Sequence, residues 1–156
     1  MKIAILYDSK YGNTKQLAKF MAEKIRIDGH ECQLFRTTKI KPAELLAFLP
    51  GALLVGGPTH FGKPTRTLGK YIKKLGKHGN QTTIDKAAVF NCNTGDDVCV
   101  IIQNQILDVF PQIEIFEKSL PVRTGSENEN NWKEVVLPMN WKEDTSDFIS
   151  KFLNFL

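Results

Sequence analysis

The chain has 156 residues, of which 42% are hydrophobic and 24% are charged, so it suits one compact domain over residues 1–156. No apolar run approaches the ~20 residues of a membrane span, and the amino terminus has no signal-peptide pattern, so we expect a cytoplasmic protein without membrane insertion. The formal charge of +4 is too small to indicate nucleic-acid binding, and no nucleic-acid partner is expected.

The cysteines give no sign of a cross-link or a metal site. Cys32, Cys92 and Cys99 are an odd number and lack the spacing of metal ligands. This pattern is typical of reduced intracellular thiols. We therefore predict neither a disulfide framework nor a bound metal.

The first predicted unit is a strand, a tight loop and a helix. The apolar run Ile3–Tyr7 predicts the strand, and apolar residues at helical spacing follow from Leu17 to Ile25. Between them lies Ser9–Thr14, with the sequence Ser-Lys-Tyr-Gly-Asn-Thr. This loop lacks both the ending of a P-loop and the three glycines of a dinucleotide fingerprint, which disfavours NTP or dinucleotide binding.

The loop nevertheless has the chemistry of an anion site. The first turn of a helix carries unpaired N–H groups and a partial positive charge. Ser9 and Thr14 add hydroxyl donors, and Gly12 lets the backbone approach a ligand. A phosphate would fit here. The alternative is a simple turn capped by Asn13 or Thr14.

The remaining elements alternate between strand and helix patterns. The later strands are predicted at 31–35, 52–56, 87–90 and 113–116, and the polar strand 31–35 suits a sheet edge. Helices are predicted at 41–49, at about 65–75, from Val98 to the residue before Pro111, and near the end of the chain with Asp144 or Thr145 as its cap. A loop at 57–64 and a polar segment at 91–97 follow the third and fourth strands.

This alternation predicts an α/β fold, a three-layer doubly wound sheet of five parallel strands in the order 2-1-3-4-5. In such a sheet the loops after strands one, three and four open at the same edge. Residues 120–141 fit less well, because they are long for a connection. They form either a surface excursion, in which 135–137 adds a short strand, or a segment that contacts a partner or substrate.

The three loops together resemble the cofactor site of flavodoxins. Ser9–Thr14 resembles the S/T-x-x-G-N-T loop with which flavodoxins wrap the phosphate of FMN, and the resemblance covers about the first 110 residues. The stretch Pro58–Gly62 also resembles the P-T-x-F-G loop of flavodoxin-like quinone reductases, which share the fold.

The resemblance implies an FMN site with no catalytic residue of its own. It assigns the phosphate to Ser9, Lys10, Tyr11, Gly12, Asn13 and Thr14. It assigns the isoalloxazine and ribityl chain to Pro58, Thr59, His60, Phe61 and Gly62, with Gly62 as a candidate for a redox-dependent peptide rearrangement. It assigns the pyrimidine edge to Asn91, Cys92, Asn93, Thr94, Gly95 and Asp96.

Several of these residues also have purely structural interpretations. Phe61 could be a lid on the core, His60 a surface histidine and Cys92 a small apolar residue at a strand end. Asp96 and Asp97 suit a helix cap better than an acid–base pair. The 91–96 segment also has no aromatic residue where many flavodoxins place a tyrosine over the flavin ring.

The leading hypothesis is an FMN-binding electron carrier that shuttles low-potential electrons between redox proteins, as a monomer or weak dimer. The runner-up is an FMN-dependent NAD(P)H:quinone reductase, which would use the ring face left open by the missing aromatic. A cofactor-free interaction domain is a third class. Many flavodoxins are acidic, whereas here we expect an acidic redox partner, because basic residues follow the second loop at Lys63, Arg66, Lys70, Lys73, Lys74 and Lys77.

Overall fold

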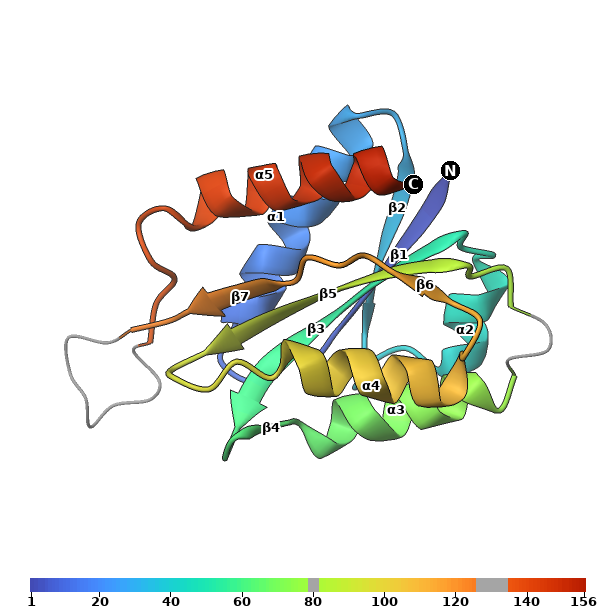
Figure 1. Ribbon diagram of the computed structural model, residues 1–156, viewed down its shortest axis with the longest axis horizontal. Coiled ribbons are helices and arrows are strands. Elements are labelled where there is room, and N and C mark those ends of the chain that lie inside the picture. Colours follow the sequence, from blue (N-terminus) through green and yellow to red (C-terminus); the bar gives the residue numbers. More distant parts are fainter. Residues whose placement is uncertain (79–81, 126–134) are drawn as a thin grey trace.

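The computed structural model describes residues 1–78, 82–125 and 135–156, which form a parallel sheet between two layers of helices (Figure 1). The strands are β1 (Lys2–Tyr7), β2 (Glu31–Arg36), β3 (Ala52–His60), β4 (Lys63–Pro64), β5 (Lys86–Asn93), β6 (Glu114–Ile115) and β7 (Leu120–Arg123). The helices are α1 (Asn13–Ile27), α2 (Pro42–Ala47), α3 (Arg66–Gly76), α4 (Cys99–Val109) and α5 (Trp141–Phe155). No helix in these described ranges is long and apolar enough to cross a membrane.

The predicted fold class and strand order are confirmed. The parallel strands lie in the order β2-β1-β3-β5-β6, and β5 and β6 are the fourth and fifth strands of the predicted 2-1-3-4-5 arrangement. In register, Ile5 of β1 lies opposite Leu34 on one side and Leu54 on the other. The carboxyl ends of β3, β5 and β7 lie together at the left of Figure 1.

Both faces of the sheet are buried, which explains the unbroken apolar runs of its central strands. Alternate side chains of β1 enter different clusters: Ile3 and Ile5 pack on one face, and Ala4 and Leu6 pack on the other. Figure 1 shows α1 and α5 over the first face and α3 and α4 over the second. The predicted helix over about 65–75 is thus confirmed as the amphipathic α3.

Four local details differ from the sequence-based expectations. The second loop, expected at 57–64, continues β3 to His60 and then turns back as β4, so it is mainly a hairpin. The fourth strand runs on to Asn93. Residues 120–123, the start of the segment expected as either a surface excursion or a contact region, form β7 beside the carboxyl end of β5. The last helix begins at Trp141 after Asn140, so Asp144 and Thr145 lie inside it, and the Thr145 hydroxyl donates back to the Trp141 carbonyl.

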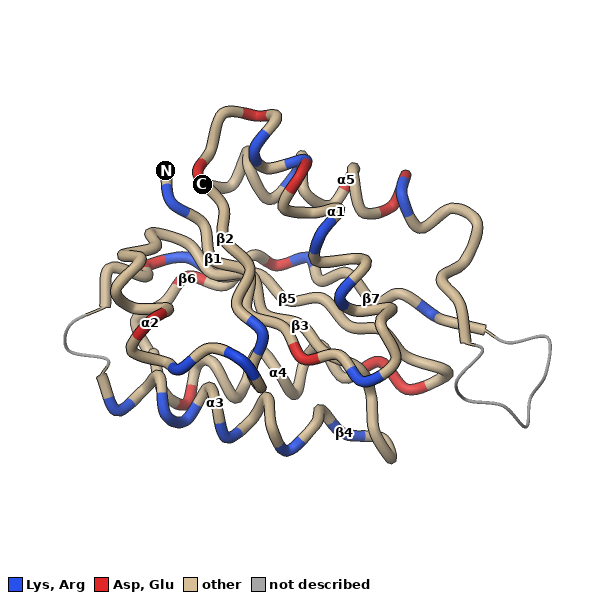
Figure 2. The backbone as a smooth tube through the Cα atoms, turned by 180° about the vertical axis from the view of Figure 1, so that it is seen from behind, with Lys and Arg blue, Asp and Glu red and all other residues tan. Residues whose placement is uncertain are grey.

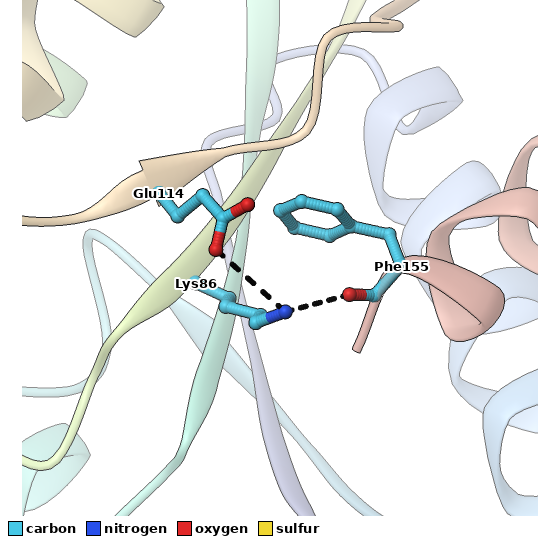
Figure 3. A network of polar contacts seen from close by, with 3 residues as sticks. All are labelled: Lys86, Glu114 and Phe155. Atoms are coloured by element: carbon cyan, nitrogen blue, oxygen red, sulfur yellow. Dashed lines mark hydrogen bonds and ion pairs between the residues drawn. The ribbon is translucent and has the colours of Figure 1, made fainter.

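A polar contact fastens the last helix to the end of the sheet opposite the strands' carboxyl ends (Figure 3). Lys86 Nζ donates to the Phe155 carbonyl at 2.7 Å and lies 3.7 Å from Glu114 Oε2. The same ammonium lies 4.4 Å from the centroid of the Phe155 ring. These contacts of Lys86 join α5, β5 and β6 at the end of the sheet away from the predicted ligand site. We therefore interpret them as contacts that stabilise the fold.

Candidate functional site

The Ser9–Thr14 loop joins β1 to the amino terminus of α1. Gly12 precedes the helix with φ +97°, a left-handed conformation that favours glycine. The helix start has no side-chain cap, so the simple turn capped by Asn13 or Thr14 is not what the structure contains. Instead the Ser9 hydroxyl accepts a hydrogen bond from Lys15 N–H at 3.2 Å, which folds the loop back over the first turn.

The N–H groups of this loop are available to a ligand. Those of residues 10–14 donate no hydrogen bond to any residue that the structure describes. The first turn of α1 also has no acidic side chain. A run of free N–H groups at a helix amino terminus is an anion-binding arrangement, because the helix dipole adds to the donors.

Asp8 holds the base of this loop, a role that the sequence reasoning missed. Its buried carboxylate accepts hydrogen bonds from Ser9 N–H at 2.9 Å, from the Thr37 hydroxyl at 3.2 Å and from the Thr65 hydroxyl. Thr65 in turn accepts from Leu68 N–H and caps α3. One carboxylate thus ties together the connections that follow β1, β2 and β4. The signal that could have identified Asp8 in the sequence is its position directly after an apolar strand.

The second predicted loop presents an exposed aromatic pair at the tip of the β3–β4 hairpin. His60 lies opposite Lys63, and the two turn residues, Phe61 and Gly62, have φ values of +51° and +69°. Two positive φ values are what a tight type I′ hairpin turn requires. Phe61 is 93% exposed, so its interpretation as a lid on the core is wrong. Its ring centroid lies 4.6 Å from that of His60.

Asn91 connects this hairpin to the third predicted segment. It is fully buried in β5, and its Nδ2 donates to the Gly57 carbonyl at 2.9 Å and to Thr59 Oγ1 at 3.1 Å. Thr59 Oγ1 lies 2.6 Å from the Asp96 carbonyl and 3.2 Å from Asn91 Oδ1. Because a hydroxyl has one proton, Thr59 donates to the nearer of the two, the Asp96 carbonyl. Asn91 Oδ1 accepts from Asn93 Nδ2 at 3.0 Å. All the polar atoms of Asn91 are therefore used inside the protein.

The segment after β5 brings small exposed residues to the same edge. Thr94, Gly95 and Asp96 are exposed, and Gly95 N–H donates to Asn93 Oδ1 at 3.1 Å. A Cβ placed on Gly62 would lie 3.6 Å from Asp96 Oδ2, so the hairpin tip and this segment are neighbours. The N-cap of α4 is Val98 rather than Asp96 or Asp97, but the Asp97 carboxylate accepts from the Cys99 N–H at 2.8 Å at the start of that helix.

Cys92 is a buried structural residue rather than a reactive one. Burial raises the pKa of its thiol to about 11, and a hydrogen bond from the Thr14 side chain opposes that rise. The thiol is therefore protonated at neutral pH, which removes the nucleophilic form. Its contact with Thr14 also joins β5 to the first loop.

Part of the 120–141 segment reaches the site as well. Asn13 Nδ2 donates to the Val135 carbonyl at 2.8 Å, and Thr124 Oγ1 donates to the Asn93 carbonyl at 3.0 Å. Val136 and Gly125 form an isolated antiparallel bridge, which is less than the short strand expected at 135–137. Residues 126–134 lie outside the described part of the chain. Sequence patterns gave no signal for these contacts, since they join residues far apart in the chain.

Comparison with solved structures identifies proteins of the same fold. Oxidised Flavodoxin 2 from Bacillus cereus matches with a TM-score of 0.74 and 22% identity, covering 100% of each chain. Oxidised Flavodoxin 1 from the same organism matches with a TM-score of 0.76 and 16% identity, over 100% of this chain and 99% of that chain. The rubredoxin oxygen:oxidoreductase of Desulfovibrio gigas matches with a TM-score of 0.75 and 16% identity, over 96% of this chain.

The last of these matches involves a longer protein, since this chain spans only 34% of the length of the Desulfovibrio chain. At these identities the structural matches establish the fold alone. A comparison with curated protein sequences gave no match. A family model described as "Flavodoxin domain" matches residues 4–101, which is more than half of the chain. The chain therefore belongs to the flavodoxin-domain family.

Proposed function

We propose that residues 1–156 form one FMN-binding domain that transfers electrons between redox proteins. The observation that carries the proposal is the first loop, where the N–H groups of residues 10–14 make no hydrogen bond to a described residue at the head of α1. A terminal phosphate is the group that such a cradle suits. FMN would supply the redox chemistry when bound, and the protein would hold and shield it.

The other two segments have complementary properties for the rest of FMN. Phe61 and His60 offer aromatic surface on an exposed hairpin tip, and a flat ring can stack on such a surface. Gly62, Thr94 and Asp96 offer backbone N–H groups to the polar edge of the ring, whereas the Gly95 N–H already donates to Asn93 Oδ1. Asn91 and Cys92 are buried, so we propose that they act by positioning the exposed residues around them.

A matched pair of glycine variants tests the phosphate cradle. Gly12→Ala and Gly29→Ala both place a Cβ at a positive φ, +97° and +89°, with no atom within 4 Å. They lie at opposite ends of α1, so their strain is similar but only Gly12 belongs to the cradle. We expect Gly12→Ala to weaken FMN binding about tenfold, a loss of about 1.4 kcal/mol.

Fluorescence titration of FMN with the apoprotein measures this effect. Gly29→Ala should bind FMN as the wild type does, even though it is similarly destabilised. Equal affinities for the two variants would contradict the assignment of the cradle. Failure of the wild-type apoprotein to bind FMN at all would contradict the proposed function.

A second candidate function is FMN-dependent reduction of quinones by NAD(P)H. It is favoured by the absence of an aromatic side chain among the exposed residues Thr94, Gly95 and Asp96, which would leave one ring face open to a second substrate. Steady-state quinone reduction by NADPH, measured without any added reductase, tests this alternative. Turnover under those conditions would favour the reductase, and reduction only through a separate reductase would favour the carrier.

The proposed partner has an acidic docking surface. The basic residues of the β4–α3 region are all exposed, and none forms an ion pair with a described residue. Figure 2 shows them as a row of blue positions along α3. Electron-transfer rates with such a partner should fall as salt is raised, because the Debye length shortens to roughly 3 Å at 1 M. Rates that are independent of salt would contradict an acidic partner.

A further inference from the structure

A second concave site lies on the α3 side of the sheet, outside the three segments described above. It is a pocket of about 390 Å³ between the β2–α2 connection and α3. A volume of this size is within the range of small-molecule pockets. Four lysines contribute to its lining: Lys39 and Lys41 from the connection, and Lys70 and Lys74 from the helix. Figure 2 shows basic positions on both of these elements.

The charge of this pocket is not neutralised by the described residues. None of the four lysines forms an ion pair with a residue in the described ranges. The carboxylate of Glu44 lies close by, but it accepts the backbone N–H of Lys41 at 2.8 Å and belongs to the cap of α2. Lys70 and Lys74 are four residues apart on one helix, where like charges destabilise the helix. An anion in the pocket would relieve this repulsion.

The pocket wall also contains a buried hydroxyl that lacks a partner. Tyr71 lines the pocket with only 5% of its surface exposed, and its hydroxyl oxygen makes no hydrogen bond to a described residue. Such a group is normally satisfied, because an unpaired buried hydroxyl is unfavourable. Burial, reinforced by the charge of Glu44, raises the pKa of Tyr71, so the hydroxyl keeps its proton and can donate.

The remaining hydroxyl groups of the pocket belong to short side chains. Thr37, Thr38 and Thr67 line the pocket with hydroxyls that can donate to an oxyanion. Thr37 also donates to Asp8, so one wall of the pocket is joined to the base of the first loop.

We propose that this pocket binds a small phosphorylated molecule that carries a diphosphate or polyphosphate group. Four ammonium groups match the three to four negative charges of a diphosphate, and hydroxyls complete its hydrogen bonding. The polar groups come from two separate elements, the β2–α2 connection and α3, so they can contact a small diphosphate from two sides. The proposal does not rest on FMN binding, since it uses different residues.

Titration of the full-length ¹⁵N-labelled protein with inorganic pyrophosphate tests the proposal. We expect saturable shifts of the amide signals of residues 37–41 and 67–74. Because the shifts are read residue by residue, pyrophosphate bound at the first loop would be distinguished by signals of residues 9–14. A parallel titration with ADP compares the affinity for a nucleotide with that for free pyrophosphate. Tighter binding of ADP would indicate that the pocket also contacts groups other than the phosphates.

Two double variants of the same helix separate a built site from general attraction. Lys70 and Lys74 line the pocket, whereas Lys73 and Lys77 do not. K70A/K74A should weaken pyrophosphate binding at least tenfold, and K73A/K77A should change it less than twofold, although both remove two charges.

Three results would overturn the proposal. The first is the absence of saturable shifts in residues 37–41 and 67–74 of the wild type. The second is an equal loss of binding in K70A/K74A and K73A/K77A, which would indicate a diffuse charge effect. The third is tighter binding of a hexaglutamate peptide than of pyrophosphate at the same residues, which would indicate an acidic protein partner instead.

Discussion

Replacing Asn91 with alanine tests whether one buried amide holds the second and third segments of the site together. The substitution removes three short hydrogen bonds: those from Nδ2 to the Gly57 carbonyl and to Thr59 Oγ1, and the one that Oδ1 accepts from Asn93 Nδ2. A further contact, from Nδ2 to the Cys92 carbonyl, is long at 3.4 Å. At about 1 kcal/mol each, loss of the three short hydrogen bonds should lower the free energy of unfolding by about 3 kcal/mol. For a chain of this length, Tm should fall by about 6–12 °C.

Urea unfolding followed by circular dichroism measures this loss. Asn104→Ala is the matched control, because Asn104 is exposed on α4 and makes no side-chain hydrogen bond to a described residue. The control should change stability by no more than about 0.5 kcal/mol. Amide exchange of the β3–β4 hairpin should accelerate in Asn91→Ala, because the hairpin loses its anchor to β5. A loss of stability below about 1 kcal/mol, or unchanged exchange in the hairpin, would refute this account.

Three further predictions concern packing, thiols and the buried tyrosine. Gly56→Ala would place a Cβ 2.3 Å from the Phe90 ring, so urea unfolding should show a loss of about 1–3 kcal/mol or more. Burial raises the pKa of Cys32 and Cys92 from 9.0 to about 11. The contribution of these two thiols to stability should therefore be constant below pH 9 and fall between pH 9 and 11, because the unfolded chain loses these protons first, by at most about 1.4 kcal/mol per pH unit for each thiol. Stability that rises in that range would contradict the assignment. Tyr71→Phe removes an unpartnered hydroxyl and should stabilise the protein by about 1 kcal/mol in urea unfolding, whereas a loss would show that the hydroxyl has a partner.

Local patterns were sufficient for the main helices and for the five strands of the predicted sheet order. The apolar runs of β1, β3 and β5 predicted buried parallel strands because both faces of this sheet are covered. The helical spacing of α1 and α3 likewise reflects contacts within one face of one element. Right-handed crossovers then left few strand orders to choose from. Each of these features depends on residues that lie close together in the chain, so it can be predicted from a single sequence.

The details of the site depend on contacts between residues far apart in the sequence. The residue pattern alone predicted that Ser9–Thr14 opens a helix with donors for an anion, and that polar segments follow the third and fourth strands. Only the tertiary structure shows that the hairpin is anchored to β5, because Asn91 and Thr59 meet across 32 positions of the chain. The same holds for the Asp8 carboxylate, whose partners Thr37 and Thr65 come from separate connections. It also holds for the lysine pocket beside α3, whose two walls come from separate elements. Side-chain contacts of this kind have no periodicity, so they appear only once the sheet has brought their segments together.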